Sequence, residues 1–284
     1  MNDTTRAPML RSARAELLRL GRWPVTWVLV GVWTILNLIF VYVFNWISYR
    51  GGDGPPTGPG ESLLPDMLPA AVPQVLVQGM PMFGGAIVMI LGALAVGSGY
   101  GWGTWKTALT QGPGRAAAFG GMLMALAVAV VGIVVLTAAV DLGVSSLVAV
   151  VEGQSSDLPA WGDLLQSIGA GVLLMGMWTA AGVVVGAVTL GPALAVGLGL
   201  VWSLVLENLL RGVSGLIDGM SAVTDHLPGS AAGSLGGSGV DAEGNGTPGV
   251  LDILTASTAS WWLAGYLLVF VALATVLVRR RDLA

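Results

Sequence analysis

Six apolar runs, each about as long as a membrane-spanning helix, restrict the possible folds of this chain more than any other feature. A helix needs about 20 apolar residues to cross the hydrocarbon core of a bilayer. The runs predicted as spans cover residues 24–46, 79–98, 116–140, 164–187, 192–210 and 261–278. Only 10% of the residues are charged, against about 25% in soluble domains. The sequence therefore predicts an all-α integral membrane protein whose six transmembrane helices form a single domain, residues 1–284.

The polar segments between the runs predict where spans end and loops begin. The third span is expected to close at Asp141, which leaves residues 142–163 as a polar loop. The long outer loop between the fifth and sixth spans is expected to be helical at 214–227. Residues 228–248 of that loop are rich in Gly and Ser, a composition that predicts a flexible stretch.

Basic residues are concentrated on one side of the predicted membrane. Ten of the twelve fall on the side of the amino terminus, namely Arg6, Arg11, Arg14, Arg19, Arg22, Lys106, Arg115, Arg279, Arg280 and Arg281. Arg50 and Arg211 fall on the other side. Because cytoplasmic loops are enriched in Lys and Arg, this asymmetry predicts a multi-pass protein with both termini in the cytoplasm. The strong preference for arginine over lysine is typical of a GC-rich bacterial genome, so the expected location is a bacterial cell membrane.

An amphipathic interfacial helix is predicted before the first span. Over residues 9–22, arginines alternate with apolar residues such as Leu17 and Leu18. This pattern is typical of a helix that lies on an anionic membrane surface. The alternative is a positively charged flank that only sets the orientation of the first span.

Residues 96–115 form a short polar island between the second and third apolar runs, and this island contains the only lysine, Lys106. Thr104 is a candidate N-cap for about two helical turns, which Gly112-Pro113-Gly114 would end. Three residues at helical spacing would share one face of this helix: Trp102, Trp105 and Leu109. An aromatic ridge of this kind indicates a docking element for another protein. Interfacial anchoring is the alternative role for such tryptophans.

This island resembles the first cytoplasmic loop of ABC-2-type transporter permeases. In that family, a segment between the second and third spans forms a coupling helix that contacts the ATPase subunit. The positions that match the family pattern are Gly103, Thr104, Leu109, Pro113 and Arg115. Many members have an acidic residue just before the tyrosine, where this chain has Gly99 and therefore lacks that charge.

The resemblance implies that the chain is the permease subunit of an ATP-driven ABC transporter, working as an exporter. It implies a second permease half, as a homodimer or heterodimer, and two copies of a separate ATPase subunit that binds the ATP. The residues expected to couple to that ATPase are Trp102, Gly103, Thr104, Trp105, Lys106, Leu109, Pro113 and Arg115. Elbow helices similar to residues 9–22 precede the first span in the same family.

The sequence lacks the residues for ATP hydrolysis and for metal chemistry. It contains no G-x-x-x-x-G-K-[ST] phosphate-binding loop, no cysteine and one histidine, His226. We therefore expect a transport subunit that is not an enzyme and that binds no cofactor or metal of its own. Its expected surroundings are the lipid bilayer and protein partners, without nucleic acid.

Glu207 is the one ionisable residue expected well within a span, and an intramembrane carboxylate is a functional candidate. Arg211 follows four residues later, at the spacing of a helical ion pair. We therefore predict an intramembrane ion pair between Glu207 and Arg211 that is mainly structural. The alternative function, an ion-coupled secondary transporter, would need several buried charges near the membrane centre.

Small and amide residues within the spans predict contacts between helices. Gly182 and Gly186 form a G-x-x-x-G pattern, which lets helices approach closely. Packing inside one six-helix bundle is the main interpretation, and a dimer interface or a gate is the alternative. Asn37 and Asn45 lie within the first span and are expected to form hydrogen bonds between helices.

Overall fold

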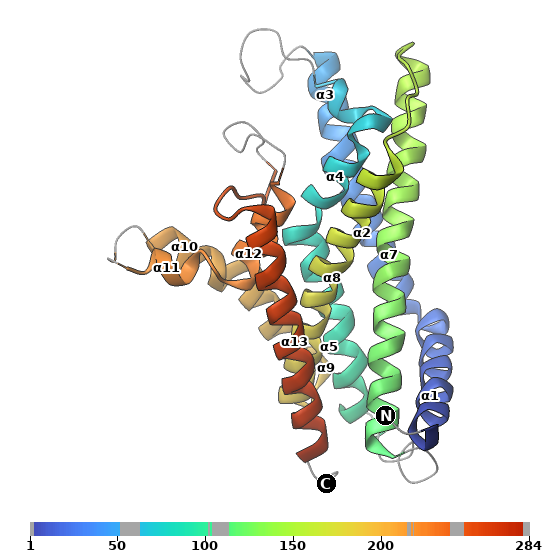
Figure 1. The fold of residues 1–284 in the computed structure, drawn as a ribbon, viewed down its shortest axis with the longest axis vertical. Coiled ribbons are helices and arrows are strands. Elements are labelled where there is room, and N and C mark those ends of the chain that lie inside the picture. Colours follow the sequence, from blue (N-terminus) through green and yellow to red (C-terminus); the bar gives the residue numbers. More distant parts are fainter. Residues whose placement is uncertain are drawn as a thin grey trace.

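The computed structural model describes residues 3–51, 63–101, 103, 114–214, 217, 219–238 and 247–280. Within these residues every regular element is a helix, so the predicted all-α class is confirmed. The helices form an elongated bundle, and the described chain begins and ends at the same end of it (Figure 1).

Within the described part of the chain, six helices are long and apolar enough to cross a membrane, as predicted. They are Pro24–Gly51, Met80–Gly101, Arg115–Val151, Trp161–Thr189, Pro192–Ser214 and Ala256–Arg280. Each is longer than predicted, because polar residues that flank an apolar run can continue its helix. Even the shortest, with 22 residues, is about 33 Å long at about 1.5 Å per residue. That length exceeds a hydrocarbon core of about 30 Å.

Three of the six spans contain a π-helical segment, a wider turn that often occurs at functional sites. In the first span, Leu38–Val43 joins α2 (Pro24–Asn37) to α3 (Phe44–Gly51). In the second span, Met80–Gly84 precedes α5 (Gly85–Gly101). In the fifth span, Val201–Leu206 joins α9 (Pro192–Leu200) to α10 (Glu207–Ser214). The other three spans are single α-helices, α7 (Arg115–Val151), α8 (Trp161–Thr189) and α13 (Ala256–Arg280).

The third span corrects the sequence prediction. α7 does not end at Asp141 but continues to Val151, so the loop predicted at 142–163 is reduced to the stretch before α8. Asp141 remains inside the bundle because its carboxylate accepts a hydrogen bond from Asn37 of the first span. With 37 residues, α7 is about 55 Å long and extends beyond a core of about 30 Å.

The predicted amino-terminal helix is present as α1 (Asp3–Arg22). One of its faces packs on α7, where Ser12 Oγ donates to the carbonyl oxygen of Ala118 at 3.3 Å. Ala13 and Leu20 of α1 are buried. Part of the apolar face therefore covers protein, a contact that the prediction of a membrane-surface helix did not include.

Close packing of α5 on α8 forms the centre of the bundle. A Cβ added at Gly182 would collide with the Met89 carbonyl oxygen, and one at Gly186 would approach that of Ala93. Gly92 of α5 is held equally close to the Thr179 backbone of α8. Gly182 and Gly186 therefore serve contacts inside the chain, which confirms the main interpretation of the G-x-x-x-G pattern.

The outer loop folds back onto the bundle through α11 (Ser221–Thr224) and α12 (Pro228–Gly236). α10 and α11 extend to one side, and α12 lies beside α13 (Figure 1). α12 is almost wholly buried, which corrects the flexible stretch predicted at 228–248 as far as its described residues reach. Its Gly, Ala and Ser side chains are small enough to pack against Pro81 and Leu251. The small residues of α12, which are typical of a flexible linker, here allow the helix to pack closely against its neighbours.

Candidate functional site

The segment predicted to couple to an ATPase lies mostly outside the described residues. Not described are Trp102 and residues 104–113, which include Thr104, Trp105, Lys106, Leu109 and Pro113, whereas Gly103, Gly114 and Arg115 are described. Gly103 adopts a left-handed conformation with φ 67°, and its N–H donates to the carbonyl oxygen of Tyr100 at 3.2 Å. Gly114 is the N-cap residue of α7. The segment thus connects the end of α5 to the start of α7.

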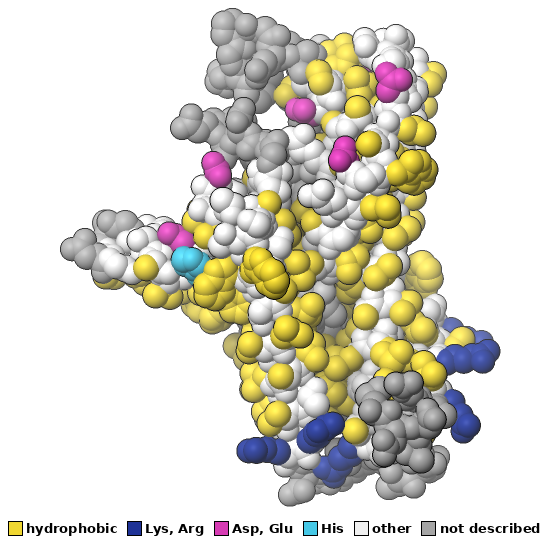
Figure 2. Space-filling model, in the orientation of Figure 1, with side chains coloured by type: hydrophobic (Ala, Val, Ile, Leu, Met, Phe, Trp, Pro, Cys, Tyr) yellow, Lys and Arg dark blue, Asp and Glu magenta, His cyan; other side chains and the backbone are white. Residues whose placement is uncertain are grey.

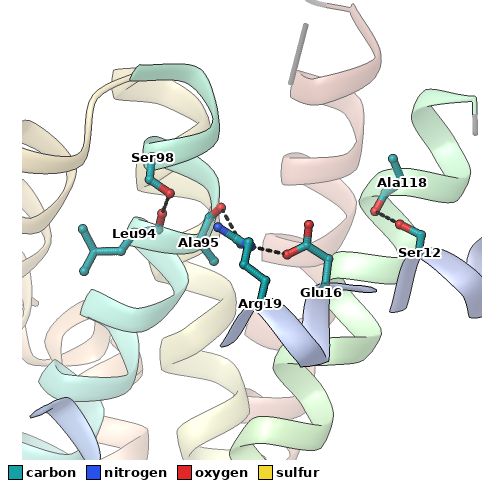
Figure 3. Close-up of polar contacts among 7 residues, drawn as sticks. All are labelled: Ser12, Glu16, Arg19, Leu94, Ala95, Ser98 and Ala118. Carbon is teal, nitrogen blue, oxygen red and sulfur yellow. Dashed lines mark hydrogen bonds and ion pairs between the residues drawn. The ribbon is translucent and has the colours of Figure 1, made fainter. Parts of the chain in front are cut away.

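α1 contacts both helices that flank this segment (Figure 3). Beside the Ser12–Ala118 hydrogen bond to α7, Arg19 reaches α5, where its guanidinium donates to the carbonyl oxygen of Ala95 at 3.5 Å. Arg19 Nε is also paired with Glu16 Oε2 at 2.7 Å. The amino-terminal helix therefore ties together the α5 and α7 ends between which the predicted coupling segment runs.

Charge is separated along the bundle. Figure 2 shows Lys and Arg side chains gathered toward the end where α13 finishes, with Asp and Glu side chains toward the opposite end. We call these the basic end and the acidic end. Arg50, predicted on the acidic side, is neutralised there by Glu152, with Nη2 2.7 Å from Oε1, and Tyr49 OH donates to the same carboxylate. The ends of α5 and α7 that flank the predicted coupling segment belong to the basic end (Figure 1).

A buried polar contact joins the first span to α7. Asn37 Nδ2 donates to Asp141 Oδ1 at 2.7 Å, and the two side chains are 2% and 0% exposed. Trp33 Nε1 donates to Thr137 Oγ1 at 2.9 Å, and Tyr42 OH donates to the backbone oxygen of Asp141 at 3.1 Å. Asn37 Oδ1 and Asp141 Oδ2 are buried without a hydrogen-bond partner. The predicted interhelical role of Asn37 is confirmed.

The sequence contains a pattern that indicates this contact, although the predicted end of the third span at Asp141 does not use it. Thr137, Asp141 and Ser145 are spaced four residues apart and so share one face of a helix. An acidic residue at the end of an apolar run was instead interpreted as the start of a loop. Asn45, by contrast, donates to the Val41 carbonyl oxygen of its own helix rather than to a neighbouring helix.

Glu207 has partners other than the predicted one. Its carboxylate accepts hydrogen bonds from Trp202 Nε1 at 2.7 Å and from the backbone N–H of Gly229 at 2.6 Å. Arg211 donates to Asn208 Oδ1, and its interaction with Glu207 is a charge interaction without direct contact, so the predicted Glu207–Arg211 ion pair is not made as a contact. Gly229 lies in the first turn of α12, where a carboxylate is stabilised by free N–H groups and by the helix dipole. Glu207 therefore attaches the outer loop to the fifth span.

A cavity of about 830 Å³ opens at the acidic end of the bundle, between α4 (Val72–Gln78), α8, α12 and α13. Its polar lining includes Gln74, Asp163, Gln166, Ser167, Ser257 and Ser260. The described lining thus combines one carboxylate with amide and hydroxyl groups, without a basic side chain. Such a lining suits a neutral polar or cationic molecule better than an anion.

The fold and these contacts define a multi-pass, all-helical membrane protein, and two carboxylates are buried among its described residues, Asp141 and Glu207. No protein-family model and no curated protein sequence matches the chain. Among the described residues, no group of three or more His, Cys, Asp or Glu side chains is arranged so that it could hold a metal ion.

Proposed function

We propose that this chain is the transmembrane permease subunit of an ATP-driven ABC transporter, working as an exporter in a bacterial cell membrane. The observation that carries the proposal is the polar segment with Trp102, Trp105 and Leu109, whose sequence resembles a coupling helix. Its position between α5 and α7 supports the proposal, because both helices reach the basic end of the bundle. By the positive-inside rule, that end faces the cytoplasm, where an ATPase would dock.

The packing offers a route from the coupling segment into the membrane. ATP binding closes the ATPase dimer and moves the two coupling segments, one on each permease half. α5 would carry that movement to α8, because their backbones are held in contact at Gly92 and Gly182. The permease contributes no bond chemistry and works by the different stabilities of its two conformations.

The first test is substitution of the central aromatic residue of the segment. The expected partner is a Walker-A ATPase encoded by a gene next to that of this chain, and the absence of such a gene would weaken the proposal. Truncating a buried aromatic anchor usually costs about 2 kcal/mol or more, which is roughly a 30-fold loss of affinity. Trp105→Ala should therefore detach or uncouple the ATPase, measured by co-purification and by substrate-stimulated ATP hydrolysis.

Lys106→Ala is the matched control, since a charge at the rim contributes less affinity and more salt sensitivity. It should weaken the complex less than Trp105→Ala does. A thermal melt of each permease variant alone separates docking from anchoring in the membrane interface. If Trp105→Ala melted early yet still bound and stimulated the ATPase, the tryptophan would be an interfacial anchor.

An ion-coupled secondary transporter is the second candidate, and the buried Asp141 is the observation that favours it. The sequence offered Glu207 as its one intramembrane acid, whereas the structure adds a second carboxylate between two spans. Transport into sealed vesicles distinguishes the candidates. Uptake that needs ATP and survives collapse of ion gradients supports the ABC permease, and the reverse supports the secondary transporter.

A further inference from the structure

Two buried acceptor oxygens lack donors at the contact between the first span and α7. The amide of Asn37 and the carboxyl group of Asp141 are joined by one hydrogen bond, from Nδ2 to Oδ1. The remaining oxygen of each group, Asn37 Oδ1 and Asp141 Oδ2, is buried without a partner. A buried acceptor without a donor has lost its hydrogen bonds to water without replacement, so one additional donor would stabilise this pair.

The surrounding donors are already committed elsewhere. Tyr42 OH donates to the backbone oxygen of Asp141 rather than to its carboxylate, and Trp33 Nε1 donates to Thr137. Arg19 is paired with Glu16 and Arg50 with Glu152, so neither arginine neutralises Asp141. An ionised Asp141 would therefore be a buried charge with one hydrogen bond and no counter-ion, a costly arrangement.

We propose that Asp141 is a proton-binding site: the folded protein holds a proton on Oδ2, which donates to Asn37 Oδ1. One proton then satisfies both orphan oxygens and closes a neutral ring of two hydrogen bonds between an amide and a carboxylic acid. Glu207 differs, because two N–H donors already hold its carboxylate. The proposal rests on the Asn37–Asp141 geometry and holds whether or not the chain works with an ATPase.

The charged and titratable groups near the Asn37–Asp141 pair provide no counter-ion for Asp141. A proton is therefore the simplest partner for the two orphan oxygens. Tyr42 contacts Asp141 from the first span, with its hydroxyl as a donor to the backbone. Farther along the same two helices, Arg50 and Glu152 neutralise each other. A monovalent cation between the two oxygens is the rival occupant, and it would need several further oxygen ligands.

Infrared spectroscopy tests the proposal directly. A protonated carboxyl group has a C=O stretching band separate from those of carboxylates, and an ester-free detergent removes the overlapping lipid signal. At neutral pH the wild-type protein should show this band, Asp141→Asn should lose the Asp141 contribution to it, and Glu207→Gln should keep that contribution. The exchange variant Asn37→Asp with Asp141→Asn retains one acid and one amide and should also keep the band. A wild-type protein without the band, or a band that is undiminished in Asp141→Asn, would overturn the proposal.

Thermal melts provide a second readout. Asp141→Asn can form the same ring without a titratable proton, so it should melt at or above the wild-type temperature. The unfolded wild-type chain releases its proton above about pH 4, whereas the folded protein keeps it. Wild-type stability should therefore fall relative to Asp141→Asn as the pH rises from about 4 to neutral pH.

The same melts distinguish the proton from its rivals. If the difference in melting temperature between the wild type and Asp141→Asn stayed constant over this pH range, Asp141 would be ionised in the folded protein. That result would contradict the proposal. Replacing sodium and potassium with a bulky organic cation should leave the difference unchanged. A wild-type protein that loses stability on that replacement, while Asp141→Asn does not, would indicate a bound metal cation instead.

Discussion

Glu207 and Asp141 have no exposed surface, yet their hydrogen-bond partners differ. Glu207 accepts one hydrogen bond on each carboxylate oxygen, from Trp202 and Gly229. Asp141 accepts one on Oδ1 and has a bare Oδ2. The two carboxylates therefore differ in their number of hydrogen-bond donors and not in their burial. Glu207 has a donor for each oxygen and holds two elements together, whereas Asp141 needs one further partner.

Glu207→Gln should destabilise the protein by about 1–3 kcal/mol, because the amide nitrogen of Gln would face one of two N–H donors. The loss should be concentrated in α11 and α12, since Glu207 caps the first turn of α12. Hydrogen exchange of residues 221–236, together with a thermal melt, measures both effects.

Arg211→Gln is the matched control for Glu207→Gln. Arg211 lies one turn further along α10 and donates to Asn208 rather than to Glu207. This variant should therefore change stability and exchange in α12 much less. Equal losses in the two variants would instead support the ion pair that the sequence predicted.

At this scale the sequence was partly informative. Polar residues inside apolar runs identified Glu207 and Asn37 as sites of interest, because such groups must find partners. Local spacing then favoured Arg211, whereas the actual partner of Glu207 is Gly229, 22 residues away along the chain. Such a partner depends on how the outer loop folds back, which helical spacing cannot reveal.

Among the elements, the spans were predictable and the outer helices were not. Apolar runs determined the number and order of the six long helices, since hydropathy measures the cost of leaving lipid. α12 escaped prediction because Gly, Ala and Ser are typical of flexible linkers and also of closely packed helices. Only the neighbouring Pro81 and Leu251 distinguish the two cases, and those neighbours belong to distant parts of the chain.

Gly182→Ala tests the close approach of α8 to α5. The added methyl group would collide with the Met89 backbone, which cannot rotate away as a side chain could. Overpacking of this kind typically costs about 1–3 kcal/mol, so the variant should melt earlier in detergent. Gly176→Ala is the control on the same helix, because nothing lies within 4 Å of its added Cβ. If Gly176→Ala lost as much stability as Gly182→Ala, the loss could not be attributed to the contact between α8 and α5. It would instead indicate that Gly176 contacts another molecule.

For the whole molecule, charge and hydropathy together favour one orientation in the membrane. Basic side chains gather at the end where α13 finishes, and the one acidic-end arginine of the first span is neutralised by Glu152. The sequence already predicted this asymmetry. The dimer and the ATPase partner stay predictions, since both concern surfaces that a single chain leaves open.

Single cysteines can test this orientation, because the natural chain contains none. A cysteine at Ser155, in the loop between α7 and α8, should react with a membrane-impermeant reagent in intact cells. Cysteines at Pro55 and Val240, which lie outside the described residues, are expected to behave in the same way. A cysteine at Gly114 should react only after the membrane is opened. Labelling of Gly114 from outside, or of Ser155 only from inside, would reverse the proposed orientation.

The π-helical turn Val201–Leu206 has an evolutionary consequence. A turn of this kind behaves as a one-residue insertion into an α-helix, which shifts the phase of everything that follows. Deleting one residue there would restore the regular helix and rotate Glu207 by about 100°. The carboxylate would then leave Trp202 and Gly229, and the outer loop would lose its attachment. Changes in the length of this span are therefore constrained even where its sequence is free to vary among apolar residues.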